Sequence, residues 1–280
     1  MMEQCTNHMR VVKSQLTSCL DLLALMASNA RGMRLTDVAQ NIGAPKSSTQ
    51  RLLEHLAGEG WIEQDEHTSQ YRLTARLAVL GQRYVESAGI RNIGEALLER
   101  LAANTGELAR LTVLDGKRLV WIGSAQGAPY GLRYEPSMGA AIVSYATANG
   151  KAWLATLPDA EAVAIARADG LGRRKKQAAI GPHALRTAAA LVAELAATRK
   201  RGYAIADEEA ERGVTALAIA IPSPAGGTVL GTASIAGPVV RVTRERYPII
   251  VAALHAIAAD LSLAWPGVSA HHPQHRERRA

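Results

Sequence analysis

Aromatic residues and thiols are scarce in this 280-residue chain: it has no phenylalanine, only 4% aromatic residues, and two cysteines, Cys5 and Cys19, near its start. So few thiols exclude a disulfide framework and indicate a reducing, cytoplasmic setting. No apolar segment typical of a signal peptide follows the first residue. No uncharged apolar run reaches the roughly 18 residues of a membrane span, since His255 and Asp260 interrupt the stretch 249–265. We therefore expect a cytoplasmic protein without membrane contacts.

The net charge is +7, but the basic excess does not lie where it would indicate DNA binding. Residues 1–75 contain seven Lys/Arg and eight Asp/Glu, so their net charge is −1. The excess lies partly in the run 173–176, which we interpret as a solvated loop, and partly in the tail 266–280, for which we expect disorder. Only the local placement of basic side chains can therefore favour DNA binding by the first part of the chain.

The stretch 35–56 has the pattern of two short helices joined by a tight turn. Thr36 is suited to be the N-cap of the first helix, and Gly43 to end it, because glycine takes a positive φ without a Cβ penalty. Pro45 suits the first turn of the second helix, where its missing N–H is not needed. Residues at helical spacing form an inward stripe on this second helix: Thr49, Leu52, Leu53 and Leu56.

The opposite side of the second helix is polar. Such side chains donate hydrogen bonds to phosphates and base edges, as the second helix of a helix-turn-helix does in the major groove. A helical hairpin with a solvated face fits the same residues. Two short strands expected at 61–63 and 71–73, around a polar turn, add a wing and favour DNA binding. The candidate DNA-binding residues are Thr36, Lys46, Ser47, Ser48, Gln50, Arg51 and Arg72.

A helix expected at 74–88 links this region to the rest of the chain. It carries an apolar stripe of Leu77, Leu80, Tyr84 and Ala88. Pairing with a partner chain would explain the stripe, and docking on its own domain would explain it equally well.

From residue 89 the pattern changes to alternating helices and strands. We expect helices near 93–101, 147–157, 158–168, 185–198 and 250–261. We expect strands near 108–114, 119–122, 131–135, 203–206, 214–221 and 228–236. Asp115–Gly116 is a hairpin signal between two of these strands. The pattern predicts an α+β domain with a mostly antiparallel sheet.

The sequence offers little for catalysis. Gly150 and Lys151 resemble the end of a phosphate-binding loop, but Tyr145 replaces its first glycine and Ala152 its Ser or Thr, so backbone packing is favoured. The acidic run 207–209 has no histidine neighbours, which favours a solvated loop over a metal or acid–base cluster. We predict no catalytic residues, no metal site and no cofactor.

A small-molecule pocket fits the second part of the chain better, although an ordinary core and its rim fit the same residues. Aromatic side chains can form a wall, small residues leave room and arginine can hold a carboxylate. The aromatic candidates are Trp121, Tyr130 and Tyr134, the small ones Ala148, Asn149 and Ser234, and the basic ones Arg110 and Arg133.

Several motifs in order resemble the IclR family of bacterial transcriptional regulators, over about residues 11–263. The run 45–53 (PKSSTQRLL) is close to the family's recognition helix, and the run 146–155 (ATANGKAWLA) to a motif of its effector domain. Further motifs are 201–204 (RGYA), Glu208–Glu209 with Gly213–Val214, and 234–238 (SIAGP).

The resemblance implies an α+β chain with a winged helix-turn-helix at 11–74, a linker helix at 75–89, a GAF-like effector-binding domain at 90–265 and a disordered basic tail at 266–280. It also implies homodimers, commonly paired into tetramers, that bind a palindromic operator in double-stranded DNA.

A small organic acid is the effector that the resemblance implies. Carried over by motif, its contacts are Leu132, Tyr134, Ile142, Ala148, Asn149, Asp207, Val214, Ala216 and Ser234. Ala216 stands where several relatives have cysteine, and Ala236 where a second serine is common. Because fewer hydroxyl and thiol donors remain, we expect an aromatic or more apolar acid instead of a small keto acid.

Two functions stay open at this point. The first is a ligand-responsive transcriptional regulator, with repression favoured over activation. The second is a small-molecule sensor or enzyme whose winged helix mediates protein contacts, which the net charge of −1 over residues 1–75 supports. Phosphate contacts predict a steep dependence of DNA binding on salt, whereas the second function predicts a mild one.

Overall fold

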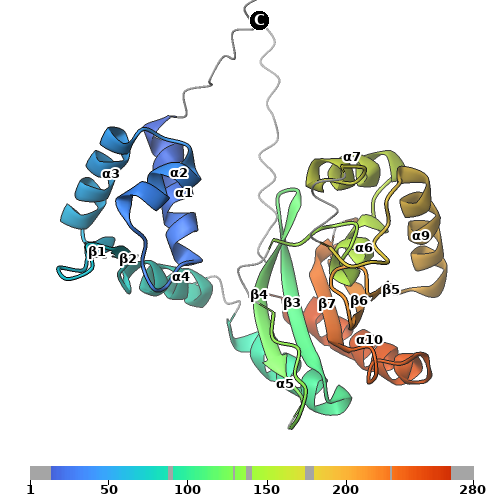
Figure 1. The fold of residues 1–280 in the computed structure, drawn as a ribbon. Helices are drawn as coiled ribbons and strands as arrows, with labels where there is room; N and C mark the ends of the chain where they lie inside the picture. The colour runs from blue at the N-terminus through green and yellow to red at the C-terminus, as the bar shows by residue number, and fades with distance from the viewer. Residues whose placement is uncertain are drawn as a thin grey trace, which may run out of the picture. The chain divides into compact units, whose positions relative to one another are not determined.

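The computed structural model describes residues 14–87, 91–128, 130–136, 141–173, 180–227 and 229–265. The chain divides into two compact units, Met1–Val85 and Glu86–Ala280 (Figure 1). This boundary falls inside the expected linker helix. The expected tail, the start of the first expected domain at 11–13 and the basic residues 174–176 lie outside the described residues.

The first unit is a winged helix-turn-helix, as predicted. Its elements are α1 (Gln15–Ala27), α2 (Leu35–Ile42), α3 (Lys46–Gly58), β1 (Ile62–Gln64), β2 (Tyr71–Leu73) and most of α4 (Arg76–Ser87). The two strands pair antiparallel, with Ile62 opposite Leu73. A small core joins all three first helices to the wing through Leu22, Met26, Val38, Ile42, Leu52, Leu53, Leu56, Ile62 and Tyr71.

The ends of α2 and α3 correct two predictions by one or two residues. Gly43 does end α2 in the left-handed conformation, at φ 68°. Thr36, however, is not the N-cap: Arg34 has the extended backbone that this position requires, and Thr36 lies inside the first turn. Likewise Pro45 precedes α3 as its N-cap, and its carbonyl accepts the Thr49 N–H at 3.0 Å.

The apolar stripe of α4 is exposed over most of its length. Leu77 is half-buried, whereas Leu80 and Tyr84 are exposed, and Ala88 lies outside the described residues. Docking on its own domain therefore does not account for Leu80. Pairing with a partner chain remains a prediction.

The second unit contains one five-stranded sheet with helices on both faces. Its strands are β3 (Leu108–Asp115), β4 (Arg118–Gln126), β5 (Ala204–Asp207), β6 (Val214–Pro222) and β7 (Val229–Pro238). They lie in the order β4-β3-β7-β6-β5, and every pairing between them is antiparallel, which confirms the α+β prediction. Its helices are α5 (Arg91–Thr105), α6 (Ala148–Leu154), α7 (Asp159–Asp169), α9 (Ala188–Arg201), the 3-10 turn η1 (Arg244–Arg246) and α10 (Tyr247–Ala264).

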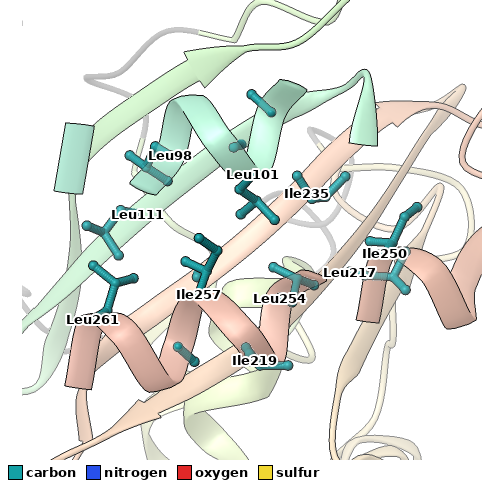
Figure 2. Close-up of a cluster of buried hydrophobic side chains, with 14 of the residues drawn as sticks. Leu98, Leu101, Leu111, Leu217, Ile219, Ile235, Ile250, Leu254, Ile257 and Leu261 are labelled. Atoms are coloured by element: carbon teal, nitrogen blue, oxygen red, sulfur yellow. The ribbon is translucent and has the colours of Figure 1, made fainter. Parts of the chain in front are cut away.

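One face of this sheet carries leucine and isoleucine and is covered by α5 and α10. Figure 2 shows Leu98 and Leu101 of α5, and Leu254 and Ile257 of α10, between these helices and the strands. The sequence pattern also predicts an inward stripe of Ile250, Leu254, Ile257 and Leu261 on the last helix, and all four are buried on α10. The segment 244–264 is long and apolar enough to cross a membrane by composition alone, with a mean hydropathy of 1.6, but this stripe packs into the core of the unit.

The other face of the sheet carries small residues and is covered by α6. Alanines of β5 and β6 pack against alanines of α6, which lets the helix lie close to the strands. The members are Ala148, Ala152, Ala204, Ala206, Ala216 and Ala218. Beyond α6, a separate core contains α7 and α9.

Two predictions for the second unit are wrong. Residues 131–135 form no strand, and two carbonyls of this segment accept from side chains: Arg241 Nη1 donates to Leu132 O and Gln126 Nε2 to Tyr134 O. In α9, Leu191, Leu195 and Thr198 are the buried residues. The sequence pattern predicts an inward stripe of Leu185, Ala188, Val192 and Leu195, of which Leu195 is buried and the other three are half-buried. The helix begins at Ala188, so Leu185 lies before it.

Candidate functional site

The outer face of α3 is the candidate DNA-binding face. Thr49, Leu52, Leu53 and Leu56 are buried, as predicted, and they fix the orientation of the helix. All five candidates on the other side are therefore exposed: Lys46, Ser47, Ser48, Gln50 and Arg51. Because the core residues repeat at helical spacing, this exposure follows directly from the sequence pattern.

Two of these five residues are held by their own helix. Ser48 Oγ donates to Pro45 O at 2.9 Å, and Gln50 Nε2 donates to Glu54 Oε1 at 2.9 Å. The side chains of Lys46, Ser47 and Arg51 have no hydrogen-bond or ion-pair partner within the part of the chain that the structure describes. The face therefore combines one oriented amide with cationic groups that can turn toward a ligand.

Thr36 and Arg72 lie on other elements of the first unit, and both already have partners. Thr36 is exposed on α2, and its hydroxyl donates to Asp37 Oδ1 at 3.3 Å. Arg72 Nε donates to Glu63 Oε1 at 2.7 Å, across the register pair of the wing. A phosphate contact by Arg72 must therefore compete with Glu63.

The turn of the wing is acidic. Asp65 Oδ1 accepts hydrogen bonds from the N–H groups of His67 and Thr68 and from the Thr68 hydroxyl. The Thr68 N–H is the main reason that the pKa of Asp65 is lowered, so this carboxylate stays charged at neutral pH. With Glu63 and Glu66 nearby in the chain, the wing is a poorer phosphate-binding element than α3.

In the second unit, Arg110 is the central residue on the α6 side of the sheet. It is buried on β3, with Ser234 of β7 and Ser124 of β4 as its register neighbours. Its guanidinium carbon lies 3.4 Å from the centroid of the Trp121 ring. Burial lowers the pKa of Arg110 to about 10, and Tyr134 opposes that shift.

Tyr134 lies between Arg110 and the loop after β5. Burial raises the pKa of Tyr134 to about 12, and the charge of Glu211 and a hydrogen bond with it act in the same direction. The structure thus brings together Trp121, Tyr134 and Arg110. It does not bring in Tyr130, which is 86% exposed, and Arg133 Nη1 lies 3.9 Å from Glu135 Oε1 on the exposed loop.

Ala148, Asn149 and Ser234 are buried on the same side of the sheet. Asn149 Nδ2 donates to Thr232 Oγ1 at 2.9 Å, and that hydroxyl lies 2.6 Å from Thr112 Oγ1. This chain of hydrogen bonds joins α6 to β7 and β3. The threonines were missed in the sequence, although each is two residues from a predicted or candidate residue and therefore on the same face.

The remaining predicted effector contacts do not all lie together in the structure. Val214 and Ala216 are half-buried on β6, and Asp207 Oδ1 accepts from Thr215 Oγ1 at 2.8 Å. Ile142 packs against the core that contains α7 and α9. Leu132 is 66% exposed, so its side chain is the outlier of the set.

A buried ion pair beside this face was missed. Lys151 is fully buried, and its Nζ lies 2.5 Å from Glu209 Oε1 and 3.5 Å from Glu194 Oε1. The solvated-loop interpretation is therefore wrong for Glu209, whose pKa is raised mainly by burial. The packing interpretation of Gly150 is confirmed, since a Cβ there would lie 2.2 Å from Ser144 O.

Metal ligands do not cluster in the parts of the chain that the structure describes, where no group of three or more His, Cys, Asp or Glu residues could hold an ion. The described residues offer an exposed polar helix face in the first unit and a buried arginine beside aromatic and hydroxyl groups in the second.

Comparison with known proteins covers both units. Residues 82–263 match the family described as bacterial transcriptional regulator IclR C-terminal, and residues 17–66 match the IclR helix-turn-helix domain. The HTH-type transcriptional regulator XynR of Escherichia coli (strain K12) is 32% identical over 72% of this chain and 77% of its own length. The Transcriptional repressor IclR of the same organism is 28% identical over 90% of each chain. A crystal structure of a transcriptional regulator from Alicyclobacillus acidocaldarius is similar with a TM-score of 0.78 and 26% identity, over 89% of this chain and 98% of that one.

Proposed function

The chain belongs to the IclR family of bacterial transcriptional regulators, and we propose that it is a repressor whose hold on a palindromic operator is changed by a small organic acid. Its relatives are regulators, and the chain is not an enzyme. The partners that Asp207 and Glu209 have in the fold, Thr215 and Lys151, also account for these acids without catalysis. We place its action in the cytoplasm, where the operator is.

The outer face of α3 is the observation that carries DNA binding. Gln50 has the amide that pairs with both hydrogen-bonding groups of an adenine edge, and Arg51 has the fork that fits guanine. Lys46 and Ser47, in the first turn, suit phosphates, which the N-terminal end of a helix also attracts. Repression is supported by the kinship with a protein described as a repressor.

Titration of the full chain against DNA from upstream of its own gene, followed by fluorescence anisotropy, tests this assignment. Arg51→Ala combined with Gln50→Ala should weaken binding by at least about thirtyfold, since each lost base contact costs about 1–3 kcal/mol. Binding should also fall steeply with salt. Unchanged affinity of the double variant would defeat the assignment of base contacts to α3.

Dimerisation is part of the proposal, because a palindromic operator needs two copies of α3 about one helical turn, roughly 34 Å, apart. The exposed Leu80 and Tyr84 of α4 support pairing of this linking helix between subunits. An effector that favours one arrangement of paired α4 helices would change the spacing of the reading helices.

We place the effector on the α6 side of the sheet in the second unit, which we take to be GAF-like. The small side chains of this side, together with the polar groups of Tyr134, Asn149 and Ser234, support this location for a compact organic acid. Of the other predicted contacts, Ala148 and Ala216 lie on this face and Val214 has the same orientation on β6, while Ile142 packs against the neighbouring core. Asp207 and its register partner Thr215 point to the α10 side of the sheet, so Asp207 and Leu132 are the weakest members of the set.

A further inference from the structure

Glu54 is an acidic residue in the middle of the outer face of α3. It is exposed and follows Gln50 by four residues and Arg51 by three, so all three share the side of the helix opposite the buried stripe. A carboxylate set against a duplex repels the phosphates and lowers affinity, whatever the sequence of the DNA. Its place on this face therefore points to a use in discrimination between sequences and not in affinity.

The printed contact of Glu54 is with Gln50. Gln50 Nε2 donates to Glu54 Oε1 at 2.9 Å, across one turn of the helix. An ionised carboxylate accepts hydrogen bonds and donates none, so the nitrogen of the Gln50 amide must face Glu54 and the amide oxygen must point away from it. The pair therefore opposes the half-turn of the amide that would exchange its donor and its acceptor.

An amide held in this way can tell adenine from guanine. The nitrogen has two N–H groups, of which one donates to Glu54 and the other remains available beside the amide oxygen. One donor and one acceptor match adenine, which offers N7 as an acceptor and N6–H as a donor in the major groove. Guanine offers two acceptors, N7 and O6, and would need the N–H group that Glu54 already occupies.

We propose that Glu54 is a positioning residue, which holds the Gln50 amide in the orientation that reads adenine and so sets the base preference at one position of each operator half-site. This inference rests on the proposed function, since it concerns the same face of α3. Glu54 contacts no base itself and acts through Gln50. Arg51 is outside the pair, so its preference for guanine does not depend on Glu54.

Selection from a library of randomised duplexes by the full chain, with sequencing of the bound DNA, tests the proposal. Wild-type protein should enrich a palindrome. Gln50→Ala should lose an adenine preference at one position of each half-site, which identifies the position that Gln50 reads. Glu54→Ala should lower the preference for adenine at that same position at least about fivefold and leave the guanine position set by Arg51 unchanged.

Two further variants separate positioning from charge. Glu59→Ala is the matched control, because it removes an exposed acid at the end of the same helix. A general gain in DNA affinity should appear in both alanine variants, whereas the adenine preference should fall in Glu54→Ala alone. Glu54→Gln removes the charge but keeps an acceptor oxygen, so it should retain part of the preference that Glu54→Ala loses.

The proposal is overturned if Glu54→Ala keeps the full adenine preference, or if Glu54→Gln loses it as completely as Glu54→Ala does. A preference lost at a different position would also overturn it, because Glu54 would then contact a base directly, as a carboxylate can at cytosine N4. So would a Gln50-dependent position that does not prefer adenine. Failure of the proposed function looks different: wild-type protein enriches no sequence from the library.

Discussion

The two units of this molecule place their polar residues in opposite ways. In the first unit, the candidate groups of α3 are exposed, and the apolar side of the helix fixes where they point. In the second unit, the polar groups that matter are inside: Arg110, Asn149, Lys151 and Glu209 are all buried. An exposed set can be changed at little cost to folding, whereas a buried set contributes to folding and recognition at once.

Two lysines make the difference concrete. Lys46 is exposed to water at the start of α3, and the proposed function assigns it a phosphate contact. Lys151 lies in α6 with its ammonium fully inside the second unit, between Glu209 and Glu194. The comparison predicts that loss of the first changes binding alone and that loss of the second changes stability.

Lys151→Met should have the largest effect on folding. Removing one member of a buried ion pair leaves the other charge unpaired, and such changes typically cost about 3–5 kcal/mol in the free energy of unfolding. Urea unfolding followed by circular dichroism measures it. Lys117→Met is the matched control, because Lys117 is 81% exposed and 3.8 Å from Glu161, and it should change nothing measurable. A loss for Lys151→Met no larger than that of the control would refute a buried pair.

The loss of unfolding free energy caused by Lys151→Met should depend on pH. Burial raises the pKa of Glu209 above its ordinary value of 4.5, so the folded state holds this proton more tightly than the unfolded state. Its contribution to stability is therefore greatest at low pH and falls as pH rises through the raised pKa. Without Lys151 that pKa rises further, so the cost of Lys151→Met should be smaller at pH 5 than at pH 8. A cost independent of pH would show that Glu209 is not left charged and buried.

Arg51→Ala tests the exposed residues of α3. It should weaken binding to the operator about ten- to a hundredfold, and leave the urea midpoint unchanged because no buried group is exposed. Anisotropy and urea unfolding on one preparation measure both. A loss of unfolding free energy comparable to that of Lys151→Met would contradict the claim that the exposed residues of α3 do not contribute to folding stability.

Glu63→Gln should have the smallest effect, and in the opposite direction. It frees Arg72 from its pair on the wing and removes one negative charge, so DNA affinity should rise about two- to fivefold at low salt. The gain should vanish as salt is raised, because exposed charges are screened. No gain at low salt would mean that the wing stays away from the phosphates.

The difference between the units also explains what the sequence could predict. The stripe of α3 and the stripe of Ile250, Leu254, Ile257 and Leu261 on α10 have the 3.6-residue period of one buried helix face, so their inward orientation was predictable. Lys151 and Glu209 are 58 residues apart in the chain, and only the packing of α6 against the loop after β5 joins them. Local pattern assigned Glu209 to solvent because an acidic run has no period that indicates burial.

Other errors arise from single contacts that no local pattern encodes. The segment 131–135 resembles a strand in composition. In the structure, however, Leu132 O accepts a hydrogen bond from Arg241, which lies more than a hundred residues later in the chain, and not from a neighbouring strand. Arg110 and Arg133 were equal candidates in the sequence, and the structure separates them by the burial of Arg110 on β3 and its stack on Trp121. Alternation along the strands could predict which residues share a face of the sheet, but not which side chains contact one another.

The most direct test of the whole account is the affinity of the full chain for its upstream DNA with and without saturating benzoate. We predict that benzoate, as a simple aromatic acid, changes the dissociation constant about 5- to 150-fold, which corresponds to about 1–3 kcal/mol of coupling. An identical dissociation constant with and without benzoate, in wild-type protein that titration shows to be saturated, would contradict it.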